Sequence, residues 1–95
     1  MSEETKKVNN NFLALVFSIS ANAWQQLGKL KNPLTDKTEK NLEHAKISID
    51  ILEMLKEKTK NNLTPEEEKL LISTLTDLQL NYVEELKKEN IEKPS

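Results

Sequence analysis

The segment FLALVFSISANAWQQLGKL, residues 12–30, decides how this chain of 95 residues folds. It contains both phenylalanines, the only tryptophan and the only glycine. If it forms a helix with about 100° per residue, apolar side chains cover most of its circumference. Such a helix is normally buried on most sides, and two short partner helices do not provide that much cover.

The helical wheel divides this segment into three sets. A continuous stripe, expected to pack on its own chain, contains Val8, Phe12, Leu15, Val16, Ile19, Ala23, Leu27 and Leu30. Beside it lie Leu13, Phe17 and Trp24, and farther round come Ala14, Ala21 and Gly28. The small residues are either a seam for close backbone approach or a chance set on a core helix. In a helix interior Gly28 would cost about 1 kcal/mol relative to alanine, which close packing or a position near the helix end would offset.

The composition outside this segment predicts an all-α protein. The chain has one Gly and three Pro, with abundant Leu, Lys, Glu and Asn. We expect three long antiparallel helices in an up-down-up arrangement, over residues 8–31, 42–60 and 65–89. They form a single domain, 8–89, between a flexible N-terminus, 1–7, and a flexible C-terminus, 90–95.

Breaks in the apolar pattern set these limits. Pro33 disfavours helix at the residue before it. Asn41 directly precedes an apolar residue and is the favoured N-cap of the second helix. Asparagine tolerates the left-handed conformation that closes a helix, and Asn61 and Asn62 follow the second helix. Thr64, followed by a proline and by Glu67, is a capping box that starts the third helix.

The run AKISIDILEMLKEKTKNNLTPEEEKLL, from Ala45 to Leu71, resembles a small bacterial family known as domain of unknown function 1844. Phe12-Leu13, Gln26-Leu27-Gly28, Asn32-Pro33 and the span from Leu78 to Tyr82-Val83 fit the same pattern. The similarity covers roughly residues 10–86. One departure is Asn61, where the pattern usually has glycine. The resemblance implies a short, cytoplasmic, all-helical protein and supplies no activity.

The charged and polar residues exclude several function classes. The chain lacks cysteine and arginine and has a net charge of −2, which argues against metal–thiolate sites and nucleic-acid binding. His44, the only histidine, is expected at an interface or partly buried rather than as a metal ligand. Asp50 is expected to be solvated and paired with Lys46. With no catalytic motif in view, we expect no enzyme activity, cofactor or metal.

Residues 12–30 also suggest two membrane-related interpretations. Ser18, Ser20 and Asn22 interrupt the run, so we expect no integral membrane segment. The order of two lysines, an apolar stretch and Ala21-Asn22-Ala23 resembles a cleavable export signal. Two glutamates in the first residues argue against export, and we expect a cytoplasmic protein.

The remaining apolar surface predicts association. Leaving several large apolar side chains in water forgoes about 1.5–3 kcal/mol for each. We therefore expect a homodimer that completes a helical bundle, and a non-enzymatic interaction or scaffold role. The alternative is a peripheral membrane or hydrophobic-ligand binding module that uses the same face. The predicted self-association face consists of Leu13, Ala14, Phe17, Ala21, Trp24, Gly28, Ile47, Ile51 and Met54.

Overall fold

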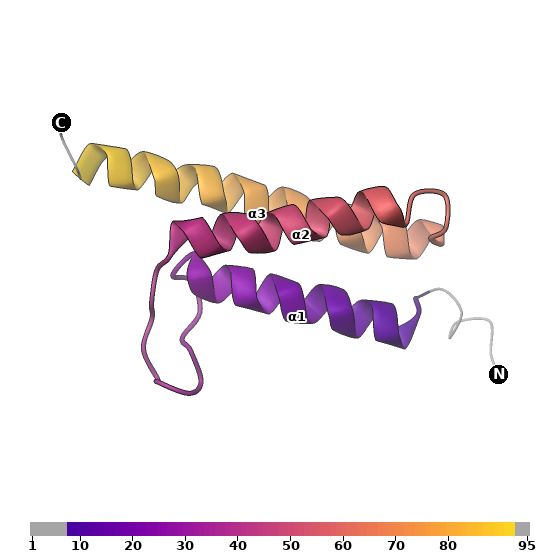
Figure 1. Cartoon of the computed structure of the whole chain (residues 1–95), viewed down its shortest axis with the longest axis horizontal. Helices are drawn as coiled ribbons and strands as arrows, with labels where there is room; N and C mark the ends of the chain where they lie inside the picture. The colour runs from indigo at the N-terminus through magenta and orange to yellow at the C-terminus, as the bar shows by residue number, and fades with distance from the viewer. Residues whose placement is uncertain (1–7, 93–95) are drawn as a thin grey trace.

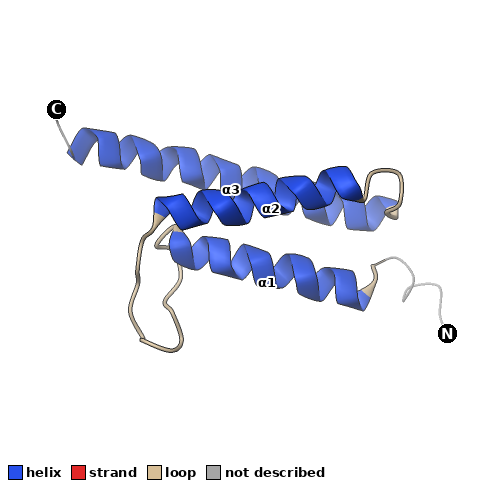
Figure 2. Ribbon diagram, in the orientation of Figure 1, coloured by secondary structure: helices blue, strands red, loops and turns tan. Residues whose placement is uncertain are grey.

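The computed structural model describes residues 8–92, with side chains up to Asn90. Within that range it contains three helices, α1 (Asn10–Gln26), α2 (Leu42–Lys58) and α3 (Pro65–Glu92), with turns and two isolated β-bridges between them. Figure 1 shows the helices packed side by side in alternating directions, and Figure 2 shows helix and loop only. The all-α class and the three packed helices are confirmed.

Helix α1 is shorter than predicted, because Gly28 stops it. Gly28 has a φ of +81°, in the left-handed region that L side chains rarely adopt. The Lys29 N–H donates to the Trp24 carbonyl oxygen at 2.9 Å, and the Gly28 N–H donates to that of Gln25 at 3.0 Å. These two bonds form a Schellman motif. The expected helix over residues 8–31 was wrong at its end, and Gly28 is a helix terminator rather than part of a helical seam.

The other helix limits differ less from the prediction. Asn9 is the N-cap of α1, and its side chain accepts from the backbone N–H groups of Asn11 and Phe12. Helix α2 ends at Lys58, and α3 continues through the expected frayed residues 90–92. The flexible segment predicted at 1–7 and the last residues of that predicted at 90–95 lie outside the described range.

The predicted caps of α2 and α3 are confirmed. The Asn41 side chain accepts from the His44 N–H at 3.0 Å. The Thr64 N–H donates to a Glu67 carboxylate oxygen at 2.9 Å, and the Glu67 N–H donates to Thr64 Oγ1 at 3.2 Å, which completes the capping box. Asn61 closes the turn after α2 with a φ of +67°. Short polar side chains therefore fix where these helices begin and end.

All three helices contribute to one hydrophobic core, with α2 packed against both α1 and α3. Its buried members are Val16, Ala23, Leu27, Ala45, Ile49, Leu52, Leu71, Leu75 and Leu78. Seven partly buried residues pack around them: Phe12, Ile19, Trp24, Leu42, Leu55, Leu63 and Tyr82. Leu15 and Leu30, which were expected in the α1 stripe, remain about half exposed. The stripe thus packs on its own chain from Phe12 to Leu27, with the exception of Leu15.

Replacing Gly28 with alanine is expected to lower the free energy of unfolding by about 1–2 kcal/mol, because alanine at a positive φ is strained. A Cβ here would also meet the Lys40 Cβ at 3.4 Å. Urea denaturation measures the change. Gly28→Asn is the control, since asparagine tolerates the left-handed region and should cost less. An alanine variant as stable as wild type would contradict this account of the helix end.

Candidate interaction surface

Helix α1 contains no charged residue in its 17 positions, in a chain of which 32% is charged. Part of this uncharged helix faces solvent. The Phe17 side chain is 70% exposed and Leu13 is 38% exposed, with exposed Ala14 beside them. We call Leu13, Ala14 and Phe17 the α1 patch. Such a patch can contact another apolar surface without desolvating any charge.

Three other residues predicted on this face have different positions. Trp24 is partly buried and packs against the core of its own chain. Ala21 is also partly buried. Gly28 lies beyond the end of α1, in the turn that stops the helix. The heptad spacing of the small residues therefore does not continue along one helical surface.

The predicted residues of α2 form a second exposed group. Ile47 is 56% exposed, Ile51 40% and Met54 48%. Their spacing of four and then three residues places them on one side of the helix. We call Ile47, Ile51 and Met54 the α2 patch.

The two patches point in different directions. The contact between α1 and α2 is marked by Gln26 and Ser48, whose side chains lie 2.7 Å apart. Phe17 is nine residues from Gln26, or about 180° around α1, so it points away from α2. Ile47 and Met54 lie about 100–120° around α2 from Ser48, on one side of it. The structure therefore brings each patch together within its helix and does not join the two patches into one face.

His44 and Asp50 are both exposed on α2. Asp50 forms a salt bridge with Lys46, as the helical spacing predicted, with 3.0 Å between Lys46 Nζ and Asp50 Oδ2. Hydrogen bonding and the charge of Asp50 raise the pKa of Lys46. Among residues 8–92, no three His, Asp or Glu side chains cluster closely enough to hold a metal ion. Nor is any helix in this range long and apolar enough to cross a bilayer.

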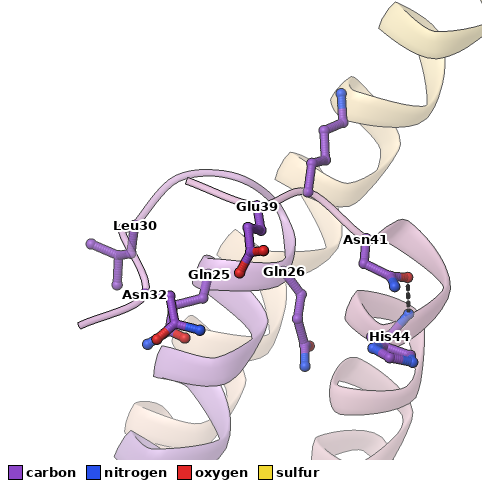
Figure 3. A pocket seen from close by; sticks show the side chains of 8 residues that line it. Gln25, Gln26, Leu30, Asn32, Glu39, Asn41 and His44 are labelled. Carbon is purple, nitrogen blue, oxygen red and sulfur yellow. Dashed lines mark hydrogen bonds between the residues drawn. The ribbon is translucent and has the colours of Figure 1, made fainter. Parts of the chain in front are cut away.

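A polar hollow of about 400 Å³ lies between the end of α1 and the start of α2. Figure 3 shows its side chains, among them Gln25, Gln26, Asn32, Asn41 and His44. Most of the polar groups already serve the fold. Asn41 caps α2, Asn32 Oδ1 accepts from the Leu34 N–H at 2.9 Å, and the Gln26 amide nitrogen, turned toward α2, donates to the His44 carbonyl oxygen at 3.0 Å. The hollow is thus better explained by the anchoring of the loop than by a ligand.

A buried carboxylate group fastens this loop to α3. Glu85 is 5% exposed, and its oxygens lie 2.9 Å from Lys29 Nζ, 2.8 Å from Lys40 Nζ and 3.1 Å from Lys88 Nζ. Hydrogen bonds, first from Lys40 and then from Lys29, lower the pKa of Glu85 from its usual 4.5 to about 2. Lys29 and Lys40 come from the two ends of the loop between α1 and α2. One side chain of α3 therefore holds both ends of that loop.

Glu67 makes a comparable link at the other end of the bundle. Besides capping α3, it accepts the Asn9 backbone N–H at 2.7 Å, which ties the start of α1 to the start of α3. Backbone hydrogen bonds, first from Thr64 and then from Asn9, lower its pKa. Glu67 and Glu85 were not predicted as buried residues. The available signal was their register, since Glu67 precedes Leu71 by four residues and Glu85 follows Tyr82 by three, so that both continue the apolar stripe of α3.

Comparison with known proteins identifies a family for this chain. The model of a family described as "Domain of unknown function (DUF1844)" matches residues 9–84. No curated protein matches the chain, and no solved structure matches it. The matched residues include all of α1 and α2 and most of α3, so both patches lie within them.

Proposed function

This chain belongs to the family described as domain of unknown function 1844, and that description states no activity. From the exposed surface of α1 we propose that the protein is a non-enzymatic helical interaction protein that self-associates through this helix. The observation that carries the proposal is the uncharged helix with Phe17 70% exposed. Burying that phenylalanine against another chain would contribute about 1.5–3 kcal/mol.

A second copy is the partner that suits an uncharged patch best. In a two-fold symmetric dimer, the same surface of both chains forms the interface. A charged residue near the axis therefore faces its own copy and is repelled by it. The α1 patch avoids that repulsion because α1 contains no charged residue. Ala14 lies next to Leu13 and Phe17 on the exposed side, and its small side chain allows a second helix to approach closely. These features support a homodimer with α1 packed on α1.

Phe17→Glu is expected to convert the dimer to a monomer, because it places two like charges in a dry contact. Light scattering combined with size-exclusion chromatography measures the mass across a range of protein concentrations. Leu80→Glu is the matched control, since Leu80 is 62% exposed on α3 and lies outside the α1 patch. This variant should remain dimeric.

Two results would count against self-association through α1. One is a folded wild-type chain that is monomeric at every concentration up to its solubility limit. The other is equal loss of the dimer in the Phe17→Glu and Leu80→Glu variants. A membrane-surface role would appear instead as co-sedimentation of the wild-type chain with liposomes, lost in Phe17→Glu. The lack of lysine and arginine on α1 speaks against that role, because interfacial helices usually carry basic residues on their polar face.

A further inference from the structure

We propose that the α2 patch docks a lysine- or arginine-rich amphipathic helix of another protein. The proposal does not depend on self-association through α1, because the two patches point in different directions. It rests on the exposure of Ile47, Ile51 and Met54 and on the charges beside them.

The spacing of the α2 patch matches the recognition of a helix. Ile47, Ile51 and Met54 follow the i, i+4, i+7 pattern by which one helix presents apolar anchors to another. Each is between 40% and 56% exposed, so their side chains retain apolar surface for a partner to cover. Met54 adds a flexible side chain that adapts to differently shaped partners.

An acidic row runs along one edge of the α2 patch. Glu43, Asp50 and Glu57 recur every seven residues, and each lies three or four positions from Ile47 or Met54. Residues at these spacings are neighbours on a helix surface. Asp50 is paired with Lys46, whereas Glu43 and Glu57 make no ion pair within residues 8–92. A partner with basic residues beside its apolar face would pair with this edge.

The same row disfavours a second copy of the chain at this site. In an antiparallel contact of α2 with α2, the acidic edge of one helix would face the acidic edge of the other. Charged residues that flank an apolar seam in this way set partner choice between helices. The α2 patch is therefore suited to a different, basic partner, whereas the α1 patch contains no charge that opposes self-pairing.

Fluorescence anisotropy with two designed peptides tests this proposal. Both are amphipathic helices with the same leucines, and they carry either lysines or glutamates on the flanks. The full chain should bind the lysine peptide at least about tenfold more tightly at low salt. The double variant Ile47→Gln, Met54→Gln should weaken that binding about tenfold or more. The variant Glu43→Lys, Glu57→Lys should remove the preference between the peptides.

Matched controls place the binding on α2. Leu80→Gln removes an exposed leucine from α3, and Phe17→Gln removes the exposed phenylalanine from α1. Both variants should bind the lysine peptide as wild type does, and circular dichroism should show every variant folded. The proposal is overturned if wild type binds both peptides equally, if the double glutamine variant binds as wild type, or if either control weakens binding as much as that variant.

Discussion

Leu52→Ala is expected to lower the free energy of unfolding by about 2–5 kcal/mol, the usual range for a buried leucine. Leu52 is 0% exposed at the centre of α2, which packs against both other helices. The truncation removes apolar contacts and leaves a cavity that neighbouring helices only partly fill. A chain of this size has a total stability of about 5–14 kcal/mol, so the variant should be close to unfolding.

Urea denaturation followed by helical circular dichroism measures the loss. Ile51→Ala is the matched control at the adjacent position, where the side chain is 40% exposed. Its cost should be clearly smaller because less apolar surface leaves a dry environment. Equal costs at both positions would mean that α2 is not oriented with Leu52 toward the core.

Glu85→Gln is expected to lower the stability by a different route, because it removes the ion pairs that hold the loop between α1 and α2. The pKa of Glu85 falls from 4.5 to about 2 in the folded chain, a shift equivalent to about 3 kcal/mol. Its three lysine partners are 35%, 32% and 53% exposed, so solvent screening reduces the expected loss at neutral pH to about 1–2 kcal/mol.

The direction of the pH dependence follows from the lowered pKa. Folding favours the charged carboxylate, so its contribution is complete above about pH 4.5 and is lost as the pH falls toward about 2. Thermal unfolding of wild type should therefore show a loss of stability across this window, and Glu85→Gln should show a smaller loss. The variant keeps some acid sensitivity, because Glu67 also has a lowered pKa.

Glu84→Gln is the control for Glu85, because it removes a carboxylate group from an exposed neighbouring position. It should leave both the stability at neutral pH and the acid profile close to those of wild type. If Glu84→Gln and Glu85→Gln behaved alike, the ion pairs of Glu85 with Lys29 and Lys40 would not be what holds the loop.

Local sequence signals predicted the helices and two of their starts. Asn41, Thr64 and Glu67 act within three residues of their partners, so the caps can be read without knowing the fold. The core residues Ile49 and Leu52 of α2, and Leu71, Leu75 and Leu78 of α3, also follow helical periodicity along the chain. These features depend on neighbours along the chain, and for that reason the sequence contains them.

The end of α1 shows where local reasoning was not sufficient. On the helical wheel, Gly28 was one of three small residues spaced seven apart. The sequence left open whether it lies in a packed seam or near the helix end. Only the backbone, with its φ of +81° and the hydrogen bond from Lys29 to Trp24, decided between them. The shorter helix leaves Leu30 outside α1 and directs Lys29 toward Glu85.

The sequence by itself determined an all-helical chain whose first helix is more apolar than its own core requires. The tertiary structure alone decided how the helices face one another and which apolar side chains stay exposed, because that depends on contacts between residues far apart, such as Gln26 with Ser48 and Lys40 with Glu85. Those contacts separate the predicted association face into the α1 patch and the α2 patch. The wheel could not show this separation, since it describes one helix at a time.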